Sequence, residues 1–192
     1  ARTAEMAKLT ENSSRDVSIA FANELSIICD KLDINVWELI QLANRHPRVN
    51  ILEPGCGVGG HCIAVDPWFI VNKTPNEARI IRTAREVNDE KPKWVVDQVK
   101  LKLAEYLLAN PDKSAANVTI GCFGIAFKPD IDDLRESPAL QIASSVEDVH
   151  VGKLLIVEPN IESLPSGTLT SCELTSFENA LEQADILVQL VN

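Results

Sequence analysis

Residues 110–127, NPDKSAANVTIGCFGIAF, mark the point where the sequence changes from helical to strand-rich. The run NPDK (110–113) is a turn-forming cluster. The following run, VTIGCFGIAF (118–127), is almost entirely apolar, which is typical of a strand buried on both faces of a parallel sheet. We therefore predict two domains, one over residues 1–110 and another over residues 111–192.

Downstream of this point, predicted helices and strands alternate. Ser137-Pro138 opens a helix at 137–148, because serine caps helices and proline suits their first turn. Residues 153–158 and 185–191 predict strands, and 176–183 predict a helix between them. This alternation indicates an α/β fold with a parallel, right-handed, Rossmann-like sheet. The last strand lies at the end of the sequence, so we expect this domain to be incomplete.

Upstream, we expect an all-helical domain interrupted by a single loop at 47–67. Four segments have apolar residues at helical spacing: 4–31, 35–45, 66–73 and 76–109. Asn35 is a predicted N-cap, with Glu38 completing a capping box. The last segment is predicted to break near Lys91-Pro92, with one helix ending around Asn88 and another beginning at Pro92.

Composition narrows the class of protein. The 192 residues carry 18 Lys and Arg against 28 Asp and Glu, a net charge of −10 that argues against a nucleic-acid surface. Neither a membrane-length apolar run nor a signal peptide is present, so we expect a cytoplasmic protein. The 5 cysteines include no CxxC pair and the histidines number 3, so neither a disulfide framework nor a metal site is expected.

The loop contains a glycine-rich run, PGCGVGGHCIAVDP (54–67). Gly55, Gly57 and Gly60 match the G-x-G-x-x-G pattern of dinucleotide-binding folds. That fingerprint requires a buried strand directly before it, and here a long helical segment and Pro54 precede it. We therefore reject the dinucleotide interpretation of this loop.

Cys62 follows these glycines directly and precedes a predicted helix. Glycines let the backbone approach a ligand closely, and amide N–H groups at a helix N-terminus stabilise a thiolate. Cys62 is therefore a candidate nucleophile. The alternative is a small buried apolar residue, which is the usual role of a lone cysteine.

Several segments together resemble one protein family. GVGGHCIAVDPWF (57–69) resembles the catalytic-cysteine loop of the UDP-glucose/GDP-mannose dehydrogenase family. AEMAKLTENSSRDVSIAFANEL (4–25) resembles its long active-site helix, and RTAREVND (82–89) also fits. FGIAFKPDIDDLRESPAL (123–140) resembles the start of its C-terminal nucleotide-binding domain. The resemblance covers essentially the whole chain.

The resemblance implies an enzyme that uses two NAD⁺ to oxidise the C6 alcohol of a UDP-sugar to a carboxylate. Cys62 matches the nucleophile that forms a thiohemiacetal and then a thioester. The family's NAD-binding domain would lie upstream of Lys8, outside these residues, so we expect the chain alone to be inactive. The helical region resembles the family's dimerisation domain, which implies a homodimer.

Three further catalytic residues follow from the resemblance. Lys8 and Asn12 form an i, i+4 pair and match the family's Lys and Asn that contact the reacting oxygen or the catalytic water. Asp66 matches an Asp that orients the water or the lysine. Spacing alone would instead suggest a solvated lysine with a surface asparagine, and an aspartate that caps the next helix.

Substrate contacts are also implied by the resemblance. Gly59 and Gly60 lie in the substrate loop, and Lys128 matches a residue near the nucleotide. Arg48 resembles a sugar-nucleotide contact, with its neighbours Arg45 and His46 as competing candidates, and His61 is expected to shape the loop. Arg135 matches a residue near NAD⁺. The alternative for Lys128 and Arg135 is surface ion pairing with the acidic residues around them: Asp130, Asp132, Asp133 and Glu136.

Within the family, residues 46–71 are most similar to members that oxidise UDP-N-acetyl-D-mannosamine. Val65 stands where UDP-glucose dehydrogenases carry Lys, which argues against UDP-glucose. Cys56 replaces an expected Pro, and Ser14 replaces an aromatic residue. Two other functions are alternatives. One is a non-catalytic dimerisation and nucleotide-binding module; the other is an unrelated cysteine hydrolase, disfavoured because His46 and His150 have no motif context.

Overall fold

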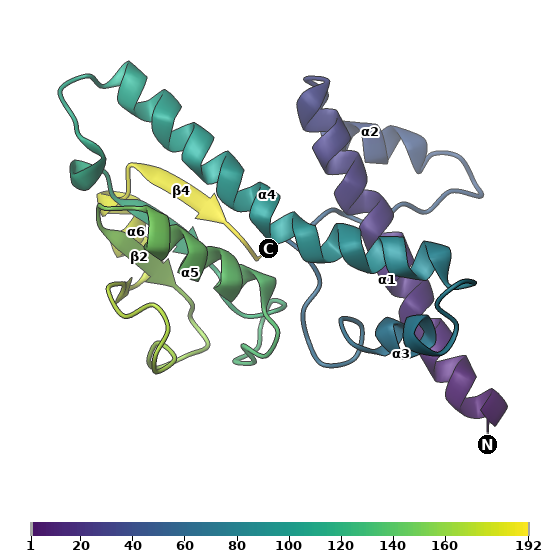
Figure 1. Cartoon of the computed structure of the whole chain (residues 1–192). Coiled ribbons are helices and arrows are strands. Elements are labelled where there is room, and N and C mark those ends of the chain that lie inside the picture. Colours follow the sequence, from purple (N-terminus) through teal and green to yellow (C-terminus); the bar gives the residue numbers. More distant parts are fainter. Residues whose placement is uncertain (1, 192) are drawn as a thin grey trace. The chain divides into compact units, whose positions relative to one another are not determined.

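The computed structural model describes residues 2–191 (Figure 1). It divides into two compact units, one extending to Lys91 and the other starting at Pro92. The division falls inside helix α4 (Arg79–Ala109), earlier in the chain than the boundary expected after residue 110. The C-terminal half of α4 therefore belongs to the strand-containing unit.

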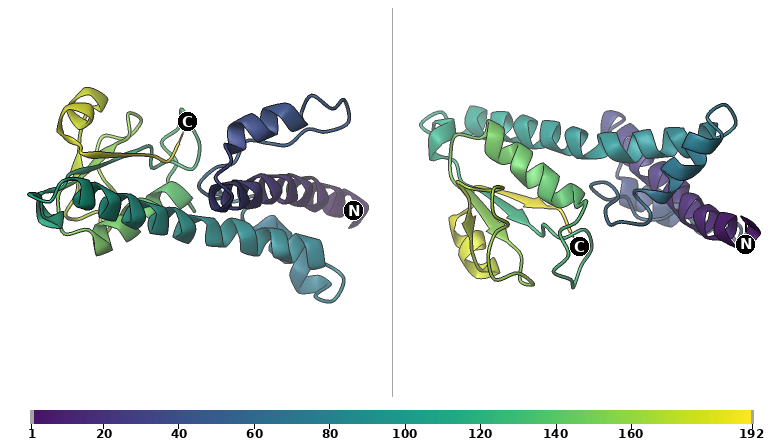
Figure 2. Two further views of the ribbon diagram at one scale, coloured as in Figure 1. Left: turned by 90° about the horizontal axis from the view of Figure 1, so that it is seen from above. Right: turned by 60° about the horizontal axis from the view of Figure 1, so that its bottom comes forward.

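The first unit is helical, as expected. It contains α1 (Arg2–Lys31), α2 (Val36–Ala43), α3 (Asp66–Lys73) and the first part of α4. Helix α1 packs against both α2 and α3, and Figure 2 shows this helical region in two further views. The predicted helices at 4–31, 35–45 and 66–73 are confirmed within a few residues at each end.

The predicted N-cap of α2 is also confirmed. The Asn35 side chain accepts hydrogen bonds from the backbone N–H groups of Trp37 at 3.0 Å and Glu38 at 3.2 Å. An N-cap supplies an acceptor for N–H groups that have no partner within the helix. The following segment, 44–65, forms neither helix nor strand, which agrees with the predicted loop.

The predicted break near Pro92 is wrong, because α4 is one continuous helix that passes through Pro92. Proline removes one helical hydrogen bond and its ring crowds the preceding turn, at a cost of about 3 kcal/mol. Tertiary contacts that fix α4 on either side of Pro92 offset part of this cost. Arg85 is held in the first unit by Asp16, and Tyr106 is held in the second unit by Asp185.

The second unit is an α/β unit with a four-stranded parallel sheet in the order β3-β2-β1-β4. Its strands are β1 (Ile120–Phe123), β2 (Leu154–Val157), β3 (Glu173–Leu174) and β4 (Ile186–Gln189). Two helices connect them, α5 (Pro138–Val149) and α6 (Phe177–Gln183). The predicted parallel, Rossmann-like sheet is confirmed. Two short elements were not predicted, namely β3 and a 3₁₀ turn at Ala115–Asn117.

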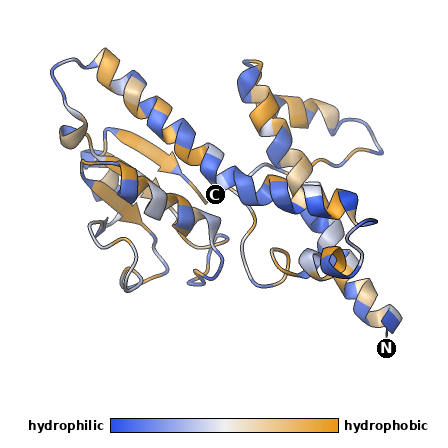
Figure 3. Ribbon diagram, viewed as in Figure 1, coloured by the Kyte–Doolittle hydropathy of each residue, from blue (hydrophilic) through white to orange (hydrophobic). Residues whose placement is uncertain are grey.

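The sheet core is made by the two central strands. All four residues of β2 and the first three of β1 are buried, whereas β4 alternates between half-buried and exposed positions. In Figure 3, strands β2 and β4 are coloured as largely apolar. Ser137 caps α5 through the Leu140 N–H at 3.2 Å, and its hydroxyl donates to the Ile125 carbonyl at 2.7 Å. Within residues 2–191, no helix is both long and apolar enough to cross a bilayer.

Candidate active site

Two of the predicted catalytic residues are in direct contact. The Asn12 side-chain amide on α1 donates a 2.6 Å hydrogen bond to Asp66 Oδ2, although the residues are 54 positions apart in sequence. Asn12 is 6% exposed and Asp66 is half-buried, so this contact is partly shielded from water. Asp66 is the first residue of α3, where a carboxylate also interacts favourably with the helix dipole.

Cys62 lies in the loop that leads into α3. Its carbonyl accepts hydrogen bonds from the N–H groups of Asp66 at 2.8 Å and Val65 at 3.2 Å. The Cys62 backbone is thus tied to the same residue that contacts Asn12. Cys62 itself is exposed, so its thiol is open to a ligand.

The other thiols are less suited to nucleophilic chemistry. Cys29 and Cys122 are buried. Burial raises the pKa of Cys122 to about 12 and that of Cys56 to about 11. Burial and the neighbouring Glu147 carboxylate raise the pKa of Cys172 to about 12. These three groups are neutral thiols at neutral pH, whereas the thiolate is the reactive form.

Lys8 lies one helical turn before Asn12, as its spacing predicted. Its Nζ is 3.4 Å from the Glu11 carboxylate, and its side chain is 60% exposed. Lys8 is therefore on the helix that carries Asn12, but its ion-pair partner is Glu11 rather than Asp66. The alternative of a solvated lysine describes its present surroundings.

The glycine-rich loop has the backbone freedom that its composition predicted. Gly57 has a φ of 144° and Gly60 a φ of 80°, in the region where glycine is favoured. Gly60 is buried and Gly59 is half-buried. Arg48 lies upstream and is exposed, with its backbone N–H donating to His46 Nδ1 at 3.3 Å. The structure does not join Arg48 to Cys62 or Asp66.

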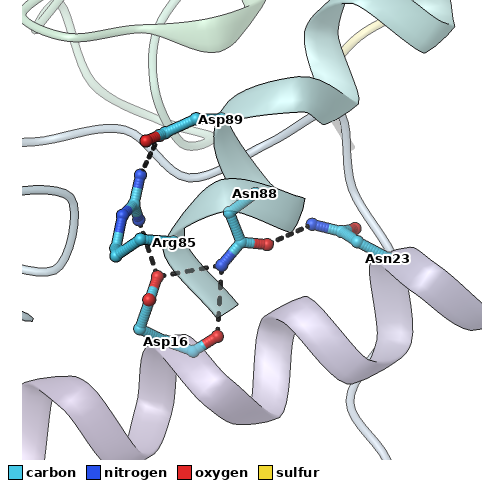
Figure 4. A network of polar contacts seen from close by, with 5 residues as sticks. All are labelled: Asp16, Asn23, Arg85, Asn88 and Asp89. Carbon is cyan, nitrogen blue, oxygen red and sulfur yellow. Dashed lines mark hydrogen bonds and ion pairs between the residues drawn. The ribbon is translucent and has the colours of Figure 1, made fainter. Parts of the chain in front are cut away.

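Sequence reasoning missed a buried polar network beside this loop (Figure 4). Asp16, Asn23, Arg85 and Asn88 are each at most 1% exposed. Arg85 Nη1 donates to Asp16 Oδ1 at 2.7 Å, and Asn23 Nδ2 donates to Asn88 Oδ1 at 2.9 Å. Burial raises the pKa of Asp16, although Arg85 and Asn88 act in the opposite direction. The signal lies in RTAREVND (82–89), where Arg85 and Asn88 stand one helical turn apart.

The second unit contains a pocket of about 1000 Å³ at the carboxyl ends of its strands. Phe123, Val157 and Gln189, the last residues of β1, β2 and β4, line it together with Lys128. Ligands of open α/β sheets bind at this edge, where loops and helix N-termini converge. The pocket is therefore a candidate nucleotide site.

The loop after β1 carries the predicted cations Lys128 and Arg135. Lys128 Nζ lies 5.7 Å from the centroid of the Phe127 ring. Arg135 Nε donates to Asp133 Oδ1 at 2.9 Å, which raises the pKa of Arg135, yet its side chain is 65% exposed. The surface ion pair weighed as an alternative is thus present for Arg135. Its exposure still allows contact with an anionic ligand.

Glu158, which sequence reasoning also missed, shapes that loop. It directly follows β2 and is 5% exposed. Its Oε2 accepts hydrogen bonds from the N–H groups of Ile125 at 2.9 Å and Ala126 at 3.1 Å. Glu158 therefore fixes the start of the loop that carries Lys128.

Comparison with known proteins matches each unit to a model of the same family. Residues 2–90 match the central domain of the UDP-glucose/GDP-mannose dehydrogenase family. Residues 121–192 match the UDP-binding domain of that family. The chain belongs to the UDP-glucose/GDP-mannose dehydrogenase family. The resemblance inferred from the sequence motifs is thereby confirmed.

Named members of this dehydrogenase family are similar along the whole chain. This chain is 65% identical to UDP-N-acetyl-D-mannosamine dehydrogenase of Yersinia pestis and 66% identical to the same enzyme of Salmonella typhi. Each alignment covers 100% of this chain and 45% of the relative. Among solved structures, the UDP-N-acetyl-mannosamine dehydrogenase of Staphylococcus aureus is similar with a TM-score of 0.81 and 42% identity, over 100% of this chain and 42% of that one. The chain thus spans less than half the length of these dehydrogenases.

Proposed function

We propose that this chain forms the catalytic-cysteine and nucleotide-binding part of an NAD-dependent UDP-sugar 6-dehydrogenase. The observation that carries the proposal is the contact between Asn12 and Asp66 next to Cys62. It gathers three residue types that the chemistry requires, namely a thiol nucleophile, an amide donor and a carboxylate. The UDP-binding domain match supports the nucleotide part.

UDP-N-acetyl-D-mannosamine is the substrate we propose. The similar proteins from Yersinia pestis and Salmonella typhi are named as dehydrogenases of that sugar nucleotide. Val65, three residues after Cys62, is 38% exposed. A valine at this position offers no charge to the substrate. The UDP-glucose dehydrogenases that this chain resembles carry a lysine there.

The proposed chemistry uses the Cys62 thiol twice. Oxidation of the C6 alcohol gives an aldehyde, and the Cys62 sulfur adds to its carbon while the carbonyl oxygen takes a proton. Loss of a hydride and that proton from the thiohemiacetal leaves a thioester. Water then adds to the thioester and the Cys62 sulfur leaves with its electron pair, releasing the carboxylate. NAD⁺, when bound, accepts the two hydrides.

Asn12, Asp66 and Lys8 have distinct proposed roles around that sulfur. An amide N–H of Asn12 and the ammonium of Lys8 stabilise negative charge on the reacting oxygen. Asp66, which the Asn12 amide holds in place, accepts a proton from the attacking water. Lys8 must leave Glu11 to take part, and an exposed pair of this kind costs at most about 1 kcal/mol to separate.

The nucleotide is proposed to contact Gly59, Gly60, Arg48 and Lys128. Exposed cations and glycine N–H groups suit phosphate recognition, and both Arg48 and Lys128 are exposed. For NAD⁺, the described residues offer one expected contact, Arg135. We therefore expect the 192-residue chain to form no NADH by itself. The five free thiols suit the reducing cytoplasm, where we place the reaction.

The test joins this chain to the part of the Yersinia pestis relative that it does not cover. NADH formation is then followed with UDP-N-acetyl-D-mannosamine and with UDP-glucose, for the parent chimera and for Cys62→Ala. We expect two NADH per UDP-N-acetyl-D-mannosamine and no complete turnover in the variant. Activity with UDP-glucose alone would overturn the substrate, and full activity in Cys62→Ala would overturn the mechanism.

A homodimer is the proposed assembly. The first unit has a groove of about 850 Å³ lined by α1 and the start of α4. Its lining includes Phe21, which is 51% exposed, and Ile80, which is 72% exposed, and a contiguous exposed apolar surface favours a protein interface. Sedimentation equilibrium should show a dimer that Ile80→Glu weakens. A monomeric parent chain at micromolar concentration would contradict this assembly.

A further inference from the structure

The loop that carries Cys62 is tied to helix α1 at both of its ends. Upstream, the backbone N–H of Gly55 donates to Asn23 Oδ1 at 2.8 Å. Downstream, Asp66 accepts the Asn12 amide at 2.6 Å. Asn12 and Asn23 therefore fix the two ends of the loop segment on one helix.

The orientation of the Asn23 amide is determined by its partners. A backbone N–H can only donate, so Asn23 must present its oxygen to Gly55 and its nitrogen elsewhere. That nitrogen donates to Asn88 Oδ1 on α4 at 2.9 Å. Asn88 Nδ2 in turn donates to the Asp16 carbonyl at 3.1 Å and to Asp16 Oδ1 at 2.9 Å (Figure 4). Asn88 thereby holds Asn23 in the orientation that Gly55 requires.

This buried polar network costs free energy of folding, and joining α1 to α4 does not require it. Arg85 and Asp16 form an ion pair with side chains 1% and 0% exposed. Buried Asp16 Oδ2 and Arg85 Nε have no hydrogen-bond partner among the described residues. Well-packed apolar side chains usually join helices at equal or lower free energy than a buried ion pair. A polar network that ends on a loop amide can instead set the position of that loop.

The loop depends on such anchors because of its own sequence. Gly57 and Gly60 have positive φ values of 144° and 80°, and glycine restricts its backbone least of all residues. Fixing a backbone residue costs about 1–2 kcal/mol in conformational entropy, which contacts must supply. Cys62 lies between these glycines and α3, so loosening the Gly55 anchor would let its thiol move.

We propose that Asn23, oriented by Asn88, is a positioning residue that holds the Cys62 loop in its reactive geometry. This inference rests on the proposed function and deepens it. Asn23 touches neither the sugar nor the reacting atoms, because it is 0% exposed and acts through the Gly55 N–H. Its effect should therefore fall on the reaction steps of Cys62 more than on binding of the nucleotide.

The first experiment measures hydrogen exchange in the 192-residue chain. Asn23→Ala should speed amide exchange across residues 55–65 by roughly tenfold or more, while α1 and the second unit keep their protection. Cys29→Ala is the matched control, because Cys29 is also buried on α1. Asn88→Ala should also speed exchange at residues 55–65, by a smaller factor. It is the variant to measure if Asn23→Ala does not fold.

The second experiment measures steady-state kinetics in the chimera described above. Asn23→Ala should lower kcat roughly 10- to 100-fold, the effect expected of a displaced nucleophile. The KM for UDP-N-acetyl-D-mannosamine should stay within about twofold, because nucleotide contacts are retained. A loss of folded protein alone would lower the apparent kcat only in proportion to the unfolded fraction, which circular dichroism measures.

The outcomes separate this inference from the proposed function. Unchanged exchange at residues 55–65 in Asn23→Ala, or a kcat equal to that of Cys29→Ala, would overturn the role of Asn23 while leaving Cys62 as nucleophile. Full activity of Cys62→Ala would overturn the proposed function and the catalytic role of the loop together. Faster loop exchange with a selective fall in kcat is the result we expect.

Discussion

At the scale of single residues, the cysteines differ in solvent exposure and should therefore differ in their rates of alkylation. Cys62 is exposed, whereas Cys29 and Cys122 are 1% and 0% exposed. Iodoacetamide should therefore alkylate Cys62 in the native chain at least about tenfold faster than either buried thiol. Peptide mapping by mass spectrometry measures the rates, with the denatured chain as control. Equal rates at Cys62 and Cys29 in the native chain would contradict the structure.

Asp185 is a residue whose charge stabilises the second unit. Its removal from water disfavours the charged form, but hydrogen bonds from Lys113, Tyr106 and the Thr119 N–H outweigh this and lower its pKa to about 2. Tyr106 Oη donates to Asp185 Oδ1 at 2.6 Å, and the Thr119 N–H donates to Oδ2 at 3.0 Å. The carboxylate thus links the end of α4, the loop before β1 and the start of β4.

The pH dependence follows from the sign of that shift. The folded pKa of Asp185 lies below its unfolded value, so its stabilisation is full above about pH 4 and is lost as pH falls towards 2. Because solvent partly screens the Asp185 charge, Asp185→Asn should cost about 1 to 2 kcal/mol at pH 7, and the difference from the parent should shrink between pH 4 and pH 2. Urea unfolding measures it. Asp97→Asn, in an exposed pair with Lys100, is the control and should cost under about 1 kcal/mol.

At the scale of elements, helix α4 shows how packing overrides a local rule. Pro92 is buried within a helix of 31 residues, and the unit boundary falls beside it. Proline near the start of a helix is favourable, so the sequence predicted two helices. Independent contacts of Arg85 and Tyr106 on either side hold the helical conformation through position 92.

This makes Pro92 a destabilising residue that the fold tolerates. Pro92→Ala restores an N–H that can donate to the Asn88 carbonyl and removes the ring from the preceding turn. We expect a gain of about 1–3 kcal/mol in the free energy of unfolding. Thermal and urea unfolding measure it, with Lys93→Ala as a neighbouring exposed control. A loss of stability would mean that packing of the proline ring outweighs the restored hydrogen bond.

At the scale of the whole molecule, the two units should respond independently to substitution. Arg85→Ala leaves Asp16 buried without its cation and should cost about 3–5 kcal/mol, whereas Arg82→Ala, with an exposed hydrogen bond to Pro75, should cost under about 1 kcal/mol. Arg85 belongs to the first unit and Asp185 to the second, and among residues 2–191 they share no hydrogen-bond partner.

The costs of Arg85→Ala and Asp185→Asn should therefore add in the double variant to within about 0.5 kcal/mol. Urea unfolding of both single variants and the double variant completes the cycle. A coupling energy above about 1 kcal/mol would show that the two sites interact energetically and that the units do not respond independently.

The sequence by itself determined the helices, their N-caps and the buried parallel strands of this protein. Helical spacing in residues 4–31, the Asn35 and Ser137 caps and the apolar runs of the parallel strands are local signals, and each is confirmed. Motif order likewise identified the dehydrogenase family. These features can be predicted from the sequence because the spacing of apolar residues and the capping of helices depend on neighbours within a few residues.

Tertiary structure alone decided the contacts between distant positions. The Asn12–Asp66 hydrogen bond, the Asn23–Gly55 anchor and the Asp16–Arg85 ion pair each join residues at least 32 positions apart. The continuity of α4 and the two-residue strand β3 also depend on packing partners elsewhere in the chain. A side chain's partner across such a separation is set by how helices and loops pack, and no local pattern in the sequence encodes that packing.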